Sequence, residues 1–310
     1  SLFQAPTVEQ LAVLLREKGW SAPDYSALVA IQPAGSRPPF FCVPGGSGSN
    51  LFGMRQIARH LGEDQPVYAL HSHALTEGVA KTRIEDIAAD YVLEISKVQP
   101  EGPYYIGGDC IGGFIAYEVA QQLQARGQQV ALLALIETAH GAGYQQRASD
   151  KRLRLRIHKE KLALLGMKDK GRYLTERVKR KISLSSKRLA CQLCLKLGVM
   201  PRVLREEYVA GMNSRAQKAY IAQPYSGKLT LFFASQDIDS QYHDRYREVW
   251  GKLVPELQSY DIPSDHTAIF RDPDVRILAQ QLNTCIETAL AHQTRTVRPE
   301  DNTDQISLVS

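Results

Sequence analysis

The sequence lacks the features that mark membrane-spanning, secreted and disulfide-bonded proteins. No apolar run among its 310 residues reaches the length of a membrane span, and the first ten residues, SLFQAPTVEQ, do not follow the charged-then-apolar pattern of a secretory signal. Its five cysteines are an odd number scattered along the chain, so no disulfide framework is predicted. We therefore expect reduced thiols in a cytoplasmic protein that has no membrane partner.

Strand-like and helical segments alternate over residues 38–293. Short apolar runs predict the strands, and apolar positions with helical spacing predict the helices. Strands are expected at 40–43, 67–70, 104–106, 130–136 and 229–234, and helices at 84–98, 114–125 and about 274–291. This alternation predicts an α/β fold with a mostly parallel central sheet that is flanked by helices.

The segment 141–223 interrupts the alternation and is short of acidic residues. It has no strand pattern, and its composition is helical. By formal counting it carries a net excess of roughly fifteen positive charges, whereas the whole chain carries only +5. We interpret this segment as a basic helical insertion in the α/β domain.

The two ends of the chain differ from the α/β domain. A helix is expected over 6–18, where Thr7 and Gln10 fit a capping box. The glycine- and proline-containing stretch that follows predicts a linker with one short strand near 28–31. The polar residues from Thr294 onward predict a disordered tail.

A glycine-rich turn between the expected strand at 104–106 and the next helix holds a cysteine. In Gly-Gly-Asp-Cys-Ile-Gly-Gly, Cys110 lies between Gly108 and Gly112, which is the arrangement of a nucleophile elbow. We expect the N-terminus of the helix to favour the Cys110 thiolate, and the N–H of Ile111 to stabilise an oxyanion. The alternative is a buried structural cysteine in a glycine-rich turn.

A thiol nucleophile of this kind needs a base, and His266 has the position that the chain order predicts. It lies in a loop before the last expected helix, which is where an α/β-hydrolase keeps its histidine. His140, just past a strand end, is the serious competitor. The remaining histidines precede the nucleophile or lie in the insertion, in a polar stretch or at the end of the last helix: His60, His71, His73, His158, His243 and His292.

The base needs a carboxylate to orient it, and the residues alone leave more than one candidate. Glu137 directly follows the expected strand at 130–136, and carboxyl ends of parallel strands are where such sheets place their sites. Asp237 and Asp239 follow the later strand at 229–234 and are the alternative.

The sequence resembles the thioesterase domains that terminate nonribosomal peptide and polyketide synthases. The matching motifs are a strand leading into an oxyanion loop, the next strand, the elbow, the acid-bearing strand end and the histidine loop, at 40–46, 66–70, 107–113, 133–138 and 262–270. The resemblance implies the α/β-hydrolase fold, assigns the acid to Glu137, and makes the N–H of Gly45 the second oxyanion donor beside Ile111.

The resemblance also implies a domain organisation. Residues 1–20 are similar to the last helix of an acyl or peptidyl carrier domain, with a linker at 21–37, the thioesterase domain at 38–293 and a flexible tail at 294–310. The insertion at 141–223 corresponds to the helical lid of the family. The expected partner is an upstream carrier domain, whose phosphopantetheine arm delivers the acyl thioester, and no tightly bound cofactor or metal is expected.

Two positions depart from the family pattern: Cys110 stands where serine is usual, and Glu137 where aspartate is usual. A cysteine keeps the acyl group as an activated thioester. We therefore hypothesise that release by cyclisation, including lactone or β-lactone closure, or by condensation is favoured over plain hydrolysis.

Three other interpretations of the sequence are weaker. A small cysteine hydrolase of the dienelactone hydrolase type has a similar elbow but lacks the long lid, and a decayed domain that only docks a carrier is the non-enzymatic alternative. A nucleic-acid surface on the basic insertion is disfavoured because stacking aromatics are not interleaved with its charges. Cys191 and Cys194 form a CxxC without a partner pair, which favours packing inside the lid over a zinc site.

Overall fold

The computed structural model describes most of the α/β domain and part of the insertion. The described residues are 27–46, 51–72, 80–138, 166–197, 201–236, 240–266 and 268–297, together with Glu9, Val13 and Leu75. The expected carrier-like helix over 6–18 lies outside them apart from those first two residues, as do 298–310 of the expected tail.

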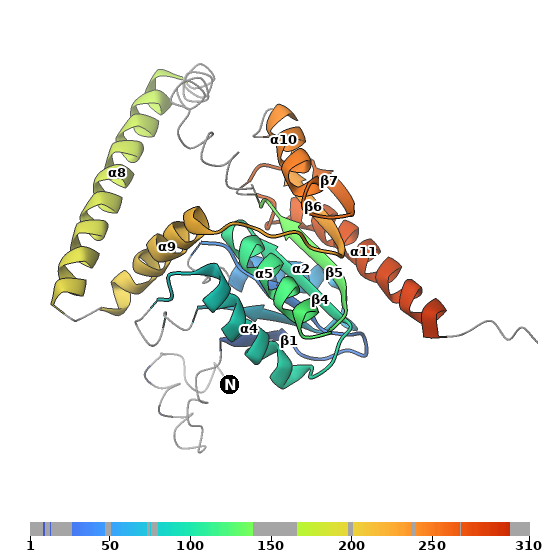
Figure 1. Cartoon of the computed structure of the whole chain (residues 1–310). Helices are drawn as coiled ribbons and strands as arrows, with labels where there is room; N and C mark the ends of the chain where they lie inside the picture. The colour runs from blue at the N-terminus through green and yellow to red at the C-terminus, as the bar shows by residue number, and fades with distance from the viewer. Residues whose placement is uncertain are drawn as a thin grey trace, which may run out of the picture.

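Seven strands form one sheet in the order β1-β3-β2-β4-β5-β6-β7. Figure 1 shows the sheet with helices packed around it. All neighbouring pairs are parallel except β1 with β3. The strands are β1 (Leu28–Gln32), β2 (Phe40–Val43), β3 (Val67–Leu70), β4 (Tyr104–Asp109), β5 (Val130–Ile136), β6 (Lys228–Ala234) and β7 (Glu256–Ile262). The α/β prediction is confirmed, and β7 is a strand that the sequence pattern did not predict.

Helices cover both faces of the sheet, because alternate residues of each central strand point to opposite faces. One face packs against α4 (Ile84–Val98), α5 (Ile111–Ala125) and α10 (Ser240–Gly251). The other face packs against α2 (Leu51–Leu61) and α11 (Asp274–Val297). β4 is buried along its whole length, which explains why its apolar run shows no alternation.

Several helix boundaries differ from the sequence-based expectation. The helix expected at 114–125 begins three residues earlier, at Ile111, directly after the cysteine of the elbow. The last helix continues to Val297, so residues 294–297 are helical rather than part of a disordered tail. The polar helix α10 was not predicted, because only its buried face, which includes Tyr246 and Trp250, is apolar.

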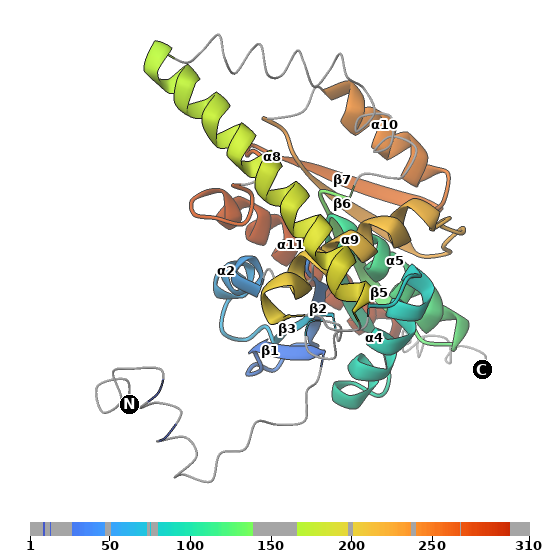
Figure 2. The same cartoon turned by 90° about the vertical axis from the view of Figure 1, so that its left-hand side faces the viewer.

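The described part of the insertion is helical, as predicted. It contains α8 (Met167–Lys196) and α9 (Arg202–Ala219), which pack on each other. α9 also contacts α4 and α5. α8 stands away from the sheet in Figure 1 and passes in front of it in the turned view of Figure 2. Cys191 is buried between the two helices, where its thiol faces the Leu204 carbonyl at 3.6 Å, and Cys194 is half-buried. Within the described ranges, no helix is both long and apolar enough to cross a bilayer.

Candidate active site

Cys110 lies in a strained turn between β4 and α5. Its backbone has φ 52° and ψ −116°, and its N–H donates to the Ile136 carbonyl at 2.8 Å. A Cβ added to Gly108 would overlap the backbone of Gly112, and one added to Gly112 would overlap the Val43 carbonyl. Both glycines are therefore needed for the strand and helix to cross this closely. The geometry is that of the predicted elbow.

Glu137 lies at the carboxyl end of β5 and is also held in a left-handed conformation. Its φ is 50°, and among the described residues only Cys110 and Glu137 are non-glycine residues with positive φ. Its N–H donates to the Phe232 carbonyl at 2.8 Å, and its Oε1 accepts the N–H of Ala234 at 2.5 Å. Such strain costs about 1–3 kcal/mol per residue and clusters at functional sites.

His266 is joined to Glu137 across 129 residues of sequence. The Nδ1 atom of His266 lies 2.7 Å from Oε2 of Glu137. Because an ionised carboxylate can only accept, we assign the hydrogen to Nδ1, which leaves Nε2 as the proton acceptor. The carboxylate is almost fully buried, whereas the imidazole is half-exposed and open to a reactant. The sequence-based pairing of these two residues is thus present in the structure.

His140, Asp237 and Asp239 lie outside the described residues. His243 is buried, stacks on Phe233 with ring centroids 4.8 Å apart, and has a role in packing.

The thiol of Cys110 is neutral at rest, which corrects the expectation that the helix N-terminus favours the thiolate. Burial, together with the nearby carboxylates of Asp109 and Glu137, raises the pKa of Cys110 to about 12, even though the Ile111 N–H lowers it. Desolvation therefore outweighs the helix N-terminus. A base must remove the proton during the reaction itself.

Asp109 is a buried carboxyl group of the site that the sequence argument overlooked. It is 6% exposed, directly precedes Cys110, and accepts the N–H of Gly45 through Oδ2 at 3.3 Å. This long bond uses the N–H that the family resemblance assigns to the oxyanion. The sequence did contain a signal for Asp109, because it is a carboxylate at the carboxyl end of a central strand and next to the nucleophile.

The pKa of Asp109 gives a prediction for the pH dependence of stability. Burial raises this pKa to about 7 from an ordinary value of 3.8, although His266 and the Gly45 N–H lower it. Since the folded protein holds the proton more tightly than the unfolded chain, its stabilising contribution is complete below about pH 4 and is lost as the pH rises through about 7. We expect the Asp109→Asn variant to gain about 2–4 kcal/mol of stability relative to wild type between pH 5 and pH 8.

Urea unfolding at the two pH values measures this difference. Equal pH dependence of the unfolding free energy in wild type and Asp109→Asn would contradict the assignment.

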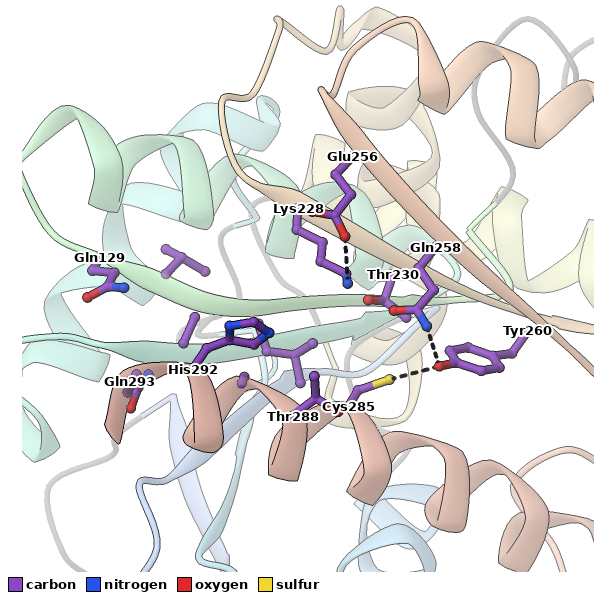
Figure 3. A pocket seen from close by; sticks show the side chains of 14 residues that line it. Gln129, Lys228, Thr230, Glu256, Gln258, Tyr260, Cys285, Thr288, His292 and Gln293 are labelled. Atoms are coloured by element: carbon purple, nitrogen blue, oxygen red, sulfur yellow. Dashed lines mark hydrogen bonds and ion pairs between the residues drawn. The ribbon is translucent and has the colours of Figure 1, made fainter. Parts of the chain in front are cut away.

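A separate cavity of about 480 Å³ lies between α11 and the first residues of β5, β6 and β7 (Figure 3). Its lining is mostly polar, with a Lys228–Glu256 ion pair of 2.7 Å. Cys285 faces the Tyr260 hydroxyl there at 3.8 Å. The cavity lies at the N-terminal ends of these strands, whereas Cys110 follows the C-terminal end of β4. The two sites are therefore at opposite ends of the parallel strands. Over the described part of the chain, no three His, Cys, Asp or Glu side chains are grouped to hold a metal ion.

Comparison with known proteins identifies a family and several relatives. Residues 38–194 match the sequence model of the family described as "Thioesterase domain". The chain is 28% identical to chondramide synthase of Chondromyces crocatus over 95% of this chain and 8% of the synthase. It is 39% identical to malpinin synthetase of Mortierella alpina over 44% of this chain and 2% of that protein. The chain thus spans a small fraction of these relatives.

Solved structures support the fold. A four-domain nonribosomal peptide synthetase bound to AMP and glycine aligns with a TM-score of 0.61 and 24% identity, covering 91% of this chain and 22% of that one. The thioesterase domain of NocB from the nocardicin cluster aligns with a TM-score of 0.57 and 20% identity, covering 85% of this chain and 98% of that domain. At these identities the likeness shows the α/β fold alone.

Proposed function

The chain belongs to the thioesterase domain family, and on this premise we propose that it takes an acyl or peptidyl group from a carrier-bound thioester onto Cys110 and then releases it. The observation that carries the proposal is the strained Cys110 turn beside a buried carboxylate that is bonded to a half-exposed imidazole. Glu137 raises the pKa of both Cys110 and Asp109, and His266 lowers the pKa of Asp109. These interactions support the view that the four residues form one cluster.

In the proposed first step, Nε2 of His266 takes the thiol proton as Sγ of Cys110 attacks the thioester carbonyl carbon. The carbon–sulfur bond to the carrier's phosphopantetheine breaks, and the departing sulfur receives the proton from His266. Glu137 holds the imidazole and stabilises its charged form. The N–H groups of Ile111 and Gly45 are the proposed oxyanion donors, and the Gly45 N–H exchanges its long 3.3 Å bond to Asp109 for the oxyanion in this step.

In the second step, an O–H or N–H group of the acyl chain, of a second molecule or of water attacks the Cys110 thioester. His266 takes the proton of the attacking group and returns one to the departing Cys110 sulfur. Because a thioester is more activated than an oxoester, a weak internal nucleophile can compete with water. We propose cyclisation, including lactone or β-lactone closure, or condensation as the favoured outcome over hydrolysis.

The proposed delivery partner is the carrier domain of a longer synthetase, whose phosphopantetheine arm brings the acyl group. Exposed basic side chains on α8, among them Arg172, Lys179 and Lys187, support an electrostatic match to an acidic carrier. The match of half the chain to the thioesterase family favours this function over a dienelactone hydrolase.

The release mode is tested by exchanging the nucleophile. We expect Cys110→Ser to shift the ratio of cyclised or condensed product to hydrolysed product toward hydrolysis, by about tenfold for a loss of roughly 1.4 kcal/mol of activation. The assay loads the protein from a carrier-bound hydroxyacyl thioester, follows the acyl-enzyme by intact-protein mass spectrometry, and separates the products by chromatography. An equal product ratio in the two proteins would rule out the role proposed for sulfur.

A further inference from the structure

Asn213 is a polar residue on the buried face of the lid helix α9. Val209, Asn213 and Ala216 follow one another at helical spacing, and all three are buried, with Asn213 only 6% exposed. Val209 packs against Ala80, and Ala216 packs into the main core. A buried amide is costly unless it is hydrogen-bonded, so its partner indicates what it does there.

That partner lies in the loop that faces the nucleophile. Nδ2 of Asn213 donates to the carbonyl oxygen of Gly46 at 2.9 Å, across 167 residues of sequence. The neighbouring Gly45 packs against the elbow so closely that a Cβ on it would lie 3.1 Å from Cβ of Cys110. The lid helix is therefore bonded directly to the loop that carries the proposed oxyanion donor.

The described part of the loop includes two consecutive glycines, Gly45 and Gly46. Gly46 has a left-handed φ of 65°, and a Cβ added to it would meet no atom within 4 Å. Two consecutive glycines give the backbone wide conformational freedom. Two hydrogen bonds hold the pair: the Gly45 N–H donates to Asp109, and the Gly46 carbonyl accepts from Asn213.

We propose that Asn213 is a positioning residue, which through its bond to the Gly46 carbonyl holds the Gly45 N–H beside the elbow, where the oxyanion forms. The inference rests on the proposed function, because it needs acylation of Cys110. A misplacement of about 1 Å at a reacting group can lower a rate by about 100-fold. Loss of the Asn213 amide is expected to act on the catalytic rate and not on substrate affinity.

The test compares Asn213→Leu, which keeps the size of the side chain but cannot donate, with Asn213→Ala as a second variant. Tyr220→Phe is the matched control, because the Tyr220 hydroxyl, directly after α9, donates to Glu118 of α5 at 2.8 Å rather than to the Gly45–Gly46 loop. Thermal melting checks that each variant folds.

Two reactions of Cys110 are measured in each protein. Acylation by an N-acetylcysteamine thioester needs an oxyanion donor, whereas alkylation by iodoacetamide does not. We expect Asn213→Leu and Asn213→Ala to lower kcat for acylation by about 10- to 100-fold. KM and the alkylation rate should stay within about twofold, and Tyr220→Phe should leave all three within about threefold.

Three results would overturn the inference: unchanged acylation in both folded Asn213 variants, an equal fall in acylation and alkylation, or an equal loss in Tyr220→Phe. Failure of the wild-type protein to form an acyl-enzyme at all would instead contradict the proposed function, so the two failures are distinguishable.

Discussion

Replacing Cys110 with alanine is expected to abolish the acyl-enzyme and to lower kcat/KM for a thioester substrate by about 10⁴-fold or more. Alanine fits the turn but provides no nucleophile for the proposed reaction with the Glu137–His266 pair. The loss is large because nucleophile and base act as a unit, so that removing either removes the covalent route. Intact-protein mass spectrometry and steady-state kinetics with an N-acetylcysteamine thioester measure both consequences.

Cys285→Ala is the matched control for this prediction. Cys285 is also a free cysteine, but it lines the cavity at the opposite, N-terminal ends of the strands (Figure 3). We expect this variant to form the acyl-enzyme and to keep its activity within about threefold, because the reacting atoms lie at the other end of the parallel strands. An acyl adduct in Cys110→Ala, or its loss in Cys285→Ala, would place the nucleophile elsewhere.

The strands of the fold could be predicted from sequence because they are buried on both faces. β2 and β5 read as continuous apolar runs, and the structure confirms both. β7 was missed because it is an edge strand whose residues are mostly half-buried, so Gln258, Ser259 and Asp261 interrupt its pattern. α10 was missed for a related reason: it exposes a polar face and buries only one stripe.

The sequence predicted those parts of the site that need particular residues close together in the chain. It did not predict the contacts between segments that are far apart in the sequence. The glycines around Cys110 mark the elbow because close crossing requires them. The bond between Asn213 and Gly46 leaves no such mark, since neither residue is unusual in its local sequence. The raised pKa of the Cys110 thiol depends on desolvation and on the carboxylates that the fold places around it, which spacing along the chain does not show.

Exchanging Glu137 for glutamine is expected to lower kcat by about 10³-fold, because both carboxylate oxygens are in use. Oε2 faces Nδ1 of His266 at 2.7 Å, and Oε1 accepts the Ala234 N–H at 2.5 Å. A glutamine amide has only one oxygen, so whichever donor receives it, the other donor faces an N–H₂ group. The neutral amide also removes the charge that stabilises the imidazolium.

The Glu137→Asp variant distinguishes the effect of the negative charge from the effect of the length of the side chain. Aspartate keeps the charge but is one methylene shorter, so it cannot bridge Ala234 and His266 without a backbone movement. We expect about a tenfold loss of kcat, smaller than that of Glu137→Gln, with urea unfolding used to confirm that both variants fold. If Glu137→Gln keeps kcat within about threefold of wild type while His266→Ala is inactive, the orienting carboxylate is not Glu137, and Asp237 or Asp239 takes its place. The order of activity among wild type, Glu137→Asp and Glu137→Gln therefore tests the hydrogen bond between Glu137, which follows β5, and His266, on which the proposed acyl transfer depends.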